Sequence, residues 1–369
     1  MYVHQLKNWP SFTWEAARVG PLLAEVRYAQ GYLMGRVSDW GFNPRQEASM
    51  ETIVTDVITN GKIEGEELPL AQVRSSVARK LGLPKAGLVT VGRDVDGMVE
   101  MMLDATQNYR QTLSHERLFN WHASLFPSGR SGLGKIVVGR YRDNTTDDPM
   151  QVISGSFGRP KVYFEAVPSA IIEHEMVALI NYVNKDQPSD DSIIKAAIVH
   201  LWLLTIHPFD DGNGRIARAV TDMMLARADG FNQRFYSMSS AILSARKYYY
   251  RTLESSQKGG LDVTEWLLWF LKTLLTALEG SSTVMTNTFA KANFWQRHQD
   301  VRLNDRQRVI LNKLWDGYAG KLTSSHYAKF TSTSQDTAAR DINYLIAHGL
   351  LRKGPAGGRS TQYVLIKET

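Results

Sequence analysis

The chain has 369 residues, of which 43% are hydrophobic and 22% charged, as in an ordinary globular protein of two or three domains. It contains no cysteine, which excludes disulfides and thiolate metal sites and is compatible with a reducing compartment. A formal net charge of +6 favours acidic partners only mildly.

Neither a signal peptide nor a membrane span is indicated. The first ten residues have no apolar core of signal-peptide length. The most apolar helices expected, around 196–204 and 266–278, are too short and too interrupted to cross a bilayer. We therefore expect a cytoplasmic protein without a membrane partner.

Apolar residues at helical spacing predict two helices near the N-terminus, over 14–34 and 45–60. The second runs into the segment Asn60-Gly61-Lys62-Ile63-Glu64-Gly65. Taken alone, Glu64 is an acidic residue at a helix C-terminus, where negative charge is mildly unfavourable. Such a residue is ordinarily a solvated surface glutamate.

Two short β-prone runs within 151–166 flank a turn rich in Gly, Ser and Pro, and this pattern predicts a β-hairpin. The hairpin has no evident chemistry of its own. An edge strand with free backbone groups could nevertheless dock an extended segment of another protein.

The side chains most suited to catalysis and to anion or metal binding are concentrated between residues 206 and 218, where the sequence reads IHPFDDGNGRIAR. An apolar helix is expected before this run, Pro208 and the glycines interrupt it, and a second helix is expected to open near Gly214 or Arg215. Glycines one residue apart let backbone N–H groups face an anion, and a helix start adds its positive end. Singly, a capping histidine, a tight turn or a solvated arginine pair is the commoner explanation. Their combination in one loop favours the binding of a nucleotide phosphate.

This run resembles the signature of Fic-domain proteins: His-Pro-Phe, two further positions, Gly-Asn-Gly-Arg, and a second Arg three residues on, with no position missing. Most characterised members transfer AMP from ATP to a hydroxyl side chain of a protein. The resemblance implies that His207 takes the hydroxyl proton, that Asp211 holds Mg²⁺ between the α- and β-phosphates, and that Phe209 anchors the loop. The nucleotide-binding residues it implies are Asp211, Gly212, Asn213, Gly214, Arg215, Ile216, Ala217, Arg218, Tyr249 and Tyr250.

A subset of Fic proteins carries an inhibitory helix that ends in Ser or Thr, three residues, Glu, then Gly or Asn. Glu64 fits that pattern, whereas Asn60 departs from it. The resemblance implies that Glu64, on a helix near 47–65, pairs with Arg218 and keeps ATP out of its productive pose. It also implies that the hairpin over 152–165 is the flap that binds a protein target by strand addition, and that Gln257 lies near the adenine.

From about residue 303 the chain changes character. Helices are expected over 305–315 and 332–345, the second closed by Gly349, and a hairpin over 350–366. This resembles a winged helix-turn-helix, whose second helix could enter a major groove with Arg352, Lys353 and Arg359 near phosphates. The same fold also serves as a protein-docking or dimerisation module, so both interpretations stay open.

Together these features predict a mainly α architecture with an N-terminal helical region over 1–105, a Fic-type helical bundle with a β-hairpin flap over 106–285, and a winged helix-turn-helix over 300–369. The leading hypothesis is a protein adenylyltransferase that uses ATP and Mg²⁺, modifies hydroxyl side chains and itself, and is restrained by Glu64. The alternative is a DNA-binding regulator whose Fic core only modifies or senses its own chain. The intact His207 and Asp211 favour the enzyme. A homodimer is common in the family and is expected on that ground alone.

Overall fold

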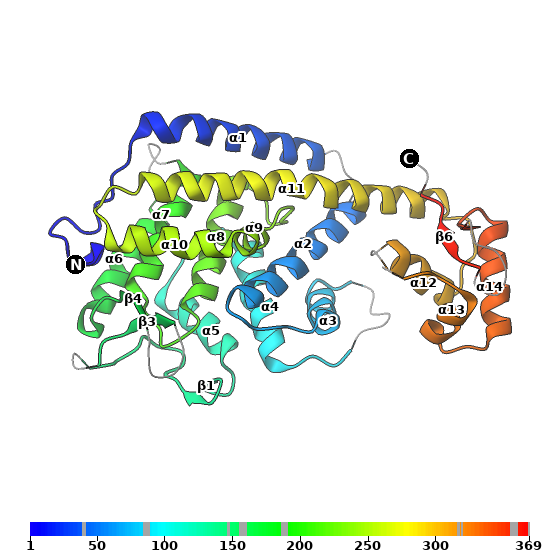
Figure 1. Ribbon diagram of the computed structural model, residues 1–369, viewed down its shortest axis with the longest axis horizontal. Coiled ribbons are helices and arrows are strands. Elements are labelled where there is room, and N and C mark those ends of the chain that lie inside the picture. The colour runs from blue at the N-terminus through cyan, green and yellow to red at the C-terminus, as the bar shows by residue number, and fades with distance from the viewer. Residues whose placement is uncertain are drawn as a thin grey trace. The chain divides into compact units, whose positions relative to one another are not determined.

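The computed structural model describes residues 1–38, 42–83, 89–145, 148–154, 161–185, 191–315, 318, 320–354 and 361–367. The chain divides into two compact units, Met1–Ser282 and Thr283–Thr369. It is mainly helical, as expected, and its described strands form antiparallel pairs (Figure 1).

The first unit is a bundle of helices in which strands are few and short. Its helices are α1 (Ala16–Ser38), α2 (Phe42–Ile63), α3 (Leu70–Lys80), α4 (Arg93–Gln107), α5 (His115–Leu125), α6 (Ile172–Asn184), α7 (Ser192–Ile206), α8 (Asn213–Asp229), α9 (Met238–Ser244) and α10 (Arg246–Lys258). Helix α11 (Thr264–Arg297) begins in this unit and continues past its last residue, Ser282. Its strands are β1 (Arg130–Ser131), β2 (Gly134–Lys135), β3 (Gln151–Ser154) and β4 (Lys161–Glu165), with short 3-10 helices at Val3–Gln5 and Ser169–Ile171.

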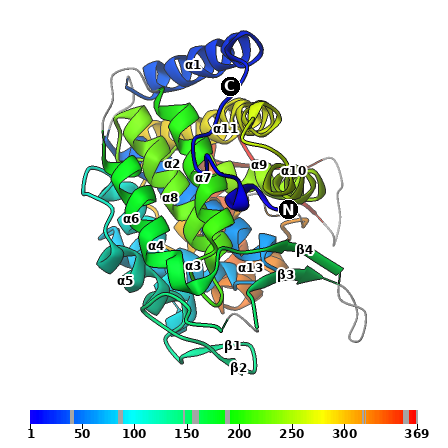
Figure 2. The ribbon, with the colours of Figure 1, turned by 90° about the vertical axis from the view of Figure 1, so that its left-hand side faces the viewer.

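The core is built around α7 and α8, which pack against each other at the centre of the bundle (Figure 2). Residues 193–206 of α7 are all buried, as its nearly unbroken apolar sequence requires. Asp191 caps this helix by accepting from the N–H groups of Ile193 at 2.8 Å and Ile194 at 3.2 Å. Helix α8 packs in addition against α2, α4 and α5. The loop between α7 and α8, which carries the motif, is therefore anchored at both ends in the core.

The predicted N-terminal helices are found as α1 and α2, both longer than the apolar spacing indicated. The helix expected over 266–278 is likewise the N-terminal part of the longer α11. The expected hairpin is present: β3 pairs with β4 in antiparallel register, with Val152 opposite Phe164. Its turn, 155–160, lies outside the described residues. No helix in the described part of the chain is both long and apolar enough to cross a membrane.

The second unit contains α12 (Asp305–Trp315), α13 (Ser324–Thr331), α14 (Gln335–Ala347), β5 (Leu351–Lys353) and β6 (Tyr363–Leu365) around a core that includes Leu311, Tyr327, Ile342 and Leu345. The helix expected over 332–345 begins only at Gln335, because the Ser334 side chain caps it by accepting from the Thr337 N–H. The short α13 was not predicted.

Gly349 closes α14 with a φ of 73°, as expected. The tip of the hairpin, with Arg359, lies outside the described residues. Three helices followed by a hairpin is the order expected of a winged helix-turn-helix, and that assignment stays a prediction.

Candidate active site

The loop between α7 and α8 begins with a residue in the left-handed backbone conformation. Helix α7 ends at Ile206, and His207 has a φ of 52°, in the left-handed region. The Arg142 guanidinium donates to the carbonyl oxygens of His207 at 2.7 Å and Ile206 at 3.3 Å. The Arg142 N–H donates to the Pro208 carbonyl at 3.0 Å. One arginine therefore satisfies the carbonyl groups left open at the end of the helix.

Asn213 and Phe209 close the loop on itself. The Asn213 side chain accepts from the Phe209 N–H at 2.9 Å and donates to the Phe209 carbonyl at 2.7 Å. The Phe209 ring is fully buried and stacks on the His122 ring at a centroid distance of 4.4 Å. Gly212 has a φ of 79°, and a Cβ there would lie 2.9 Å from the Phe126 ring. A side chain at position 212 is therefore excluded by both strain and space.

His122 positions the backbone of Asp211. Its Nδ1 accepts from the Gly139 N–H at 3.2 Å, so Nε2 carries the proton and donates to the Asp211 carbonyl oxygen at 3.2 Å. Burial lowers the pKa of His122, which favours this neutral form. The imidazole thus connects Gly139, in the segment after β2, to the motif loop through two hydrogen bonds.

His207 has the tautomer that a general base needs. Its Nδ1 lies 3.3 Å from the Leu204 carbonyl oxygen, which can only accept, so Nδ1 carries the proton and Nε2 has the free lone pair. Burial lowers the pKa of His207 to about 4. The imidazole is consequently neutral at physiological pH. Gln257 donates to the same carbonyl at 3.2 Å and supports this end of α7.

Asp211 presents a half-exposed carboxylate at the same loop. It accepts from the Ser131 hydroxyl and from the Gly212 N–H at 2.5 Å. No group of three or more metal-ligating side chains occurs among the described residues. Mg²⁺ bound together with a triphosphate needs only one or two carboxylates, because phosphate oxygens and waters supply the other ligands. The donor set at Asp211 fits that requirement.

Two buried arginines follow the anion cradle at the start of α8. Arg215 and Arg218 are 4% and 2% exposed, far less than a solvated arginine pair. Within the described part of the chain, Nε of Arg215 and Nη1 of Arg218 are buried without a hydrogen-bond partner. Ile216 and Ala217 lie between them on the core side of α8, and the Ile216 N–H donates to the Gly212 carbonyl at 2.9 Å. The arginines, rather than these two residues, therefore face the loop.

Glu64 reaches this site from the end of α2. Its carboxylate accepts from Nη2 of Arg218 at 2.6 Å. A methyl group on Gly214 would overlap the same carboxylate oxygen, so Glu64 lies directly over the start of α8. Asn60 also binds Arg218, through its side-chain oxygen at 2.7 Å and its backbone carbonyl at 3.3 Å. The residue that departs from the family pattern thus contributes to the same contact.

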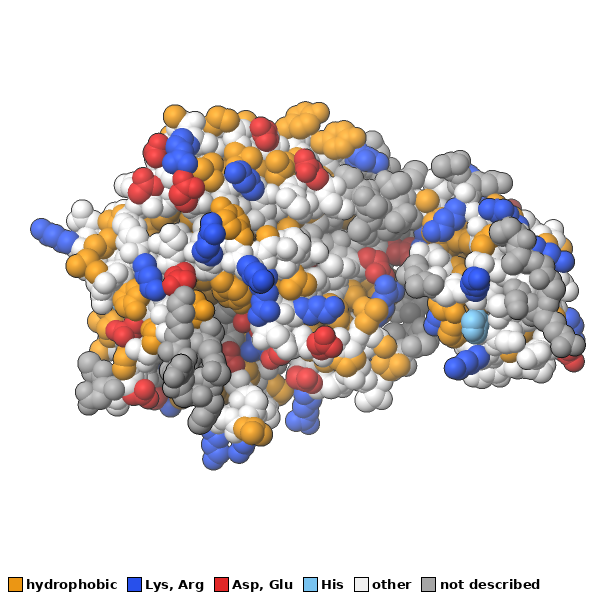
Figure 3. All heavy atoms as spheres, viewed as in Figure 1, with side chains coloured by type: hydrophobic (Ala, Val, Ile, Leu, Met, Phe, Trp, Pro, Cys, Tyr) orange, Lys and Arg blue, Asp and Glu red, His pale blue; other side chains and the backbone are white. Residues whose placement is uncertain are grey.

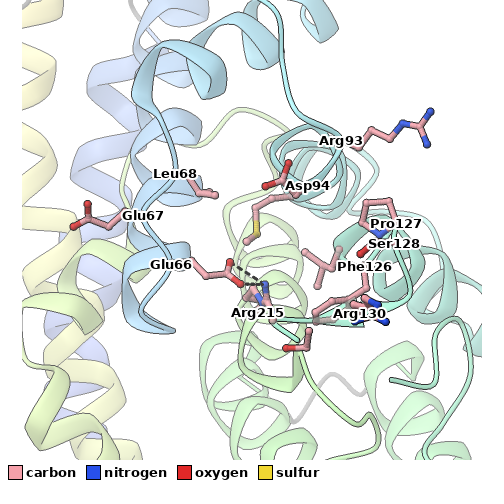
Figure 4. A pocket seen from close by; sticks show the side chains of 14 residues that line it. Glu66, Glu67, Leu68, Arg93, Asp94, Phe126, Pro127, Ser128, Arg130 and Arg215 are labelled. Atoms are coloured by element: carbon pink, nitrogen blue, oxygen red, sulfur yellow. Dashed lines mark hydrogen bonds and ion pairs between the residues drawn. The ribbon is translucent and has the colours of Figure 1, made fainter. Parts of the chain in front are cut away.

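The charge of Arg218 is well compensated. Burial alone would lower the pKa of Arg218, but the charge of Glu64 and its hydrogen bond outweigh burial and raise the pKa. Arg215, one turn earlier, has a carboxylate of its own in Glu66 (Figure 4). Both motif arginines are therefore neutralised from the segment that follows α2.

A cavity of about 700 Å³ opens beside Arg215. It is lined by residues from four places in the chain, among them Glu66, Arg93, Phe126, Arg130 and Arg215 (Figure 4). Ser131, which binds Asp211, also lines it. The cavity therefore adjoins the carboxylate and the arginine of the motif loop.

Comparison with known families accounts for this arrangement. Residues 112–225, which include the whole loop, match the Fic/DOC family, and residues 2–83 match a domain of unknown function (DUF4172). Residues 112–225 of the chain therefore form a Fic domain. The expectation drawn from the motif is thereby confirmed.

The curated relatives of this chain are distant. It is 26% identical over 216 residues to "Protein adenylyltransferase fic-1" of Caenorhabditis briggsae, which covers 57% of this chain and 38% of that protein. It is 27% identical over 191 residues to "Protein adenylyltransferase Fic" of Aedes aegypti, covering 50% and 34% respectively. The chain thus spans less than two fifths of the length of these curated relatives.

Solved structures agree with the fold. A Fic family protein from Desulfovibrio desulfuricans G20 has a TM-score of 0.53 at 18% identity, covering 98% of this chain and 99% of that one. Fic-1 of Caenorhabditis elegans, residues 134–508, has a TM-score of 0.53 at 21% identity, covering 74% and 76%. At these identities the likeness shows the fold alone.

The two tyrosines named from the sequence differ in exposure. Tyr249 is buried, and its hydroxyl lies 3.0 Å from Nε2 of His200 in the core of the first unit. Tyr250 is 39% exposed and donates to the Ile63 carbonyl at the end of α2, at 3.4 Å. Tyr250 is thus the one with an accessible ring. It also links α10 to the segment that carries Glu64.

Three residues that support the motif were missed by sequence reasoning: His122, Arg142 and Glu66. Each comes from a segment 65 or more residues away from its contact in the loop or α8. The spacing of residues within the motif contains no information about them. Glu66 lies two residues beyond Glu64, so the acidic run Glu64-Gly65-Glu66-Glu67 was the local signal available.

Proposed function

We propose that this Fic-domain protein is a protein adenylyltransferase, which moves AMP from ATP to a hydroxyl side chain of a protein. The observation that carries the proposal is the meeting of a neutral His207, the Asp211 carboxylate and two buried arginines at the N-terminus of α8. Such a set suits a nucleotide with its phosphates and a metal ion. The reaction named for the curated relatives supports the same choice.

The reaction is an in-line displacement at phosphorus. The target hydroxyl oxygen attacks the α-phosphorus, the bond from that phosphorus to the oxygen bridging to the β-phosphate breaks, and pyrophosphate leaves. The hydroxyl proton passes to Nε2 of His207, whose lone pair is free because Nδ1–H faces the Leu204 carbonyl. Backbone N–H groups at the start of α8, together with Arg215, stabilise the charge on the phosphate oxygens.

Asp211 is the residue that would hold Mg²⁺. Its side chain is 43% exposed, and the Ser131 hydroxyl and the Gly212 N–H fix its orientation. When bound, the ion would neutralise charge on the α- and β-phosphates. Arg218 would bind the phosphate furthest from the reacting centre.

In the proposed resting state, Glu64 restrains this activity. Its carboxylate occupies the guanidinium of Arg218 and adds negative charge over the α8 N-terminus, where the phosphates must bind. An arginine–carboxylate hydrogen bond in a largely buried pocket is strong, and like charges close to a phosphate oppose its binding. ATP therefore lacks one of its arginines until α2 moves.

Incorporation of label from α-³²P-ATP into protein tests the proposal with wild type, Glu64→Gly and Glu64→Gly/His207→Ala. We expect Glu64→Gly to incorporate at least about tenfold more label than wild type, since a charged hydrogen bond of this kind is worth roughly 1.5–3 kcal/mol. The double variant should incorporate none, because the base is missing.

Equal labelling of wild type and Glu64→Gly would remove Glu64 from this role. Labelling that survives His207→Ala would remove His207 from its role. Incorporation from γ-labelled ATP alone would replace adenylyl transfer with a kinase-like reaction.

The hairpin β3–β4 is the proposed docking element for a protein target. In the described part of the chain this hairpin has two strands, so each has an outer edge that can pair with an extended segment. Self-modification provides an assay that needs no identified target. Tyr28 and Tyr248, which are 78% and 50% exposed, offer accessible hydroxyls for it.

A second function, nucleic-acid binding by the C-terminal unit, is favoured by the distribution of charge. Residues 283–369 contain thirteen Lys and Arg against six Asp and Glu, whereas residues 1–282 contain thirty against thirty-one. Basic side chains appear on the visible face of the C-terminal unit (Figure 3). Exposed ones include Lys321, Lys329, Arg340, Arg352 and Lys353. A charge excess concentrated in one small unit is the footprint of a phosphate-backbone ligand.

A further inference from the structure

Glu66 forms a second ion pair with the motif, distinct from that of Glu64. Both oxygens of its carboxylate accept from Nη1 of Arg215, at 2.8 and 2.9 Å (Figure 4). The Arg215 side chain is 5% exposed, whereas that of Glu66 is 46% exposed. A solvent-facing carboxylate thus covers a cation that the proposed reaction uses for phosphate.

The turn after α2 presents the two carboxylates together. Gly65 has a φ of 86°, which reverses the chain at the helix end. The N–H groups of Glu64 and Glu66 both donate to the Gly61 carbonyl, at 3.0 and 2.9 Å. Their partners Arg218 and Arg215 are three residues apart on α8 and so lie on neighbouring positions of one face. Each carboxylate therefore meets an arginine of its own.

We infer that Glu66 determines the affinity for nucleotide by competing with phosphate for Arg215, independently of Glu64; this inference rests on the proposed function. Nη1 of Arg215 is occupied by Glu66, and Nη2 lies 3.7 Å from the Asp211 carboxylate. A phosphate that approaches Arg215 meets a guanidinium whose charge is already balanced. It must displace Glu66 or bind against its negative charge.

Support for Arg215 does not depend on Glu66. The Phe126 ring centroid lies 4.8 Å from the Arg215 guanidinium, and Arg215 is one of the buried residues of α8. The cavity beside the pair gives the Glu66 side chain room to move away. Replacing Glu66 should therefore release the guanidinium and leave its position unchanged.

Glu67 is a matched control for this replacement. It is adjacent in sequence, has the same charge and is exposed. Its side chain points away from Arg215 (Figure 4). Glu67→Gln removes the same charge from the same segment without opening an ion pair to the motif.

The test is isothermal titration calorimetry of the full-length protein with Mg²⁺ and α,β-methylene-ATP, whose α–β bridge cannot be cleaved. Glu66→Gln and Glu67→Gln are each added to Glu64→Gly. We expect Glu66→Gln to bind the analogue about three- to tenfold more tightly than Glu64→Gly alone, as for a partly exposed ion pair, and Glu67→Gln to bind it unchanged. In turnover with ATP, the KM of Glu66→Gln should fall by a similar factor while kcat stays the same.

Equal affinities for the Glu66→Gln and Glu67→Gln variants, or weaker binding by Glu66→Gln, would overturn the inference and leave adenylyl transfer standing. Tighter binding without transfer of label would support the inference and contradict the proposed reaction. If the analogue binds to none of the variants, both are wrong.

Discussion

The imidazole of His207 combines burial with a hydrogen bond that fixes its tautomer. Nδ1–H faces the Leu204 carbonyl, and burial lowers the pKa to about 4. A base with such a pKa is deprotonated over the whole physiological range. Proton transfer to it is correspondingly less favourable than to an ordinary histidine. A larger fraction of the imidazole is therefore neutral, but the neutral imidazole is a weaker base.

The low pKa of His207 has a consequence for the pH dependence of transfer. Because the proposed base acts in its neutral form and its pKa lies below 6.5, activity should persist as pH falls through 6.5 and be lost only towards pH 4. Single-turnover label transfer by Glu64→Gly between about pH 4.5 and 8 measures this limb. Tryptophan fluorescence of the same samples should confirm that the protein stays folded. Half-loss of the rate near pH 6.5 would contradict the buried environment of the base.

At the residue scale, the motif itself was predictable and its supports were not. His207, Asp211 and Arg218 lie within twelve positions, so a single local pattern identifies them. Arg142 and His122 act through contacts that span 65 and 89 residues. Such contacts depend on the tertiary packing of α5 and of the segment after β2, which residue spacing does not encode.

Among the elements, α2 connects the packing of the bundle to the proposed restraint of the site. It packs against α3, α4, α8 and α9, and Ile53, Val54 and Val57 are buried in those contacts. The helix ends at Ile63, and the Gly65 turn then directs Glu64 and Glu66 toward α8. The position of both carboxylates therefore depends on the docking of one helix and the geometry of one turn.

Gly65→Ala should destabilise the turn that positions Glu64 and Glu66. An alanine at a φ of 86° is strained, so we expect a loss of about 1–2 kcal/mol in the free energy of unfolding and a rise in self-labelling. Gly20→Ala is the control, because Gly20 lies in α1 with no atom within 4 Å of an added Cβ. That variant should gain about 0.5–1 kcal/mol and label as wild type does. Urea unfolding measures the free energy of unfolding of both variants. An unchanged free energy of unfolding for Gly65→Ala would argue against a rigid turn.

Helices with a long apolar stripe were predictable, whereas their ends and the short helix α13 were not. The expected helix over 305–315 is found without change as α12. The eight-residue α13 is too short for its periodicity to stand out from a polar segment. Helix α14 begins three residues late, because the Ser334 side chain provides the cap that the composition alone could not place.

For the molecule as a whole, the excess of basic residues and the proposed catalytic residues lie in different units. The residues of the proposed catalytic site are all in Met1–Ser282, whose formal charge is close to zero, and the basic excess is in Thr283–Thr369. The sequence indicated a change of character near residue 303, while the compact units divide at 282. Helix α11 continues through this point, so the polar run Glu279-Gly280-Ser281-Ser282-Thr283 marks the division between the units without ending the helix.

Binding of a fluorescent mixed-sequence duplex to the full-length protein tests the basic unit. We expect anisotropy to reveal binding at about 50 mM salt that weakens steeply by about 200 mM, as phosphate contacts require. Arg352→Ala/Lys353→Ala should weaken binding and reduce the salt slope by about one per lost phosphate contact. Lys7→Ala/Lys272→Ala removes the same charge from exposed positions of the first unit and should have no effect. No binding at low salt, or equal behaviour of the two double variants, would favour protein docking instead.

The pairing of Glu64 with Arg218 joins two parts of one polypeptide, and this has a consequence for how the cell could tune the protein. Under the proposed restraint, Glu64 is present at a fixed effective molarity, so neither the expression level nor dilution changes the fraction of molecules in which it covers Arg218. On the same proposal, an event that binds or alters the α2 segment, and so shifts its docking equilibrium, would change the output.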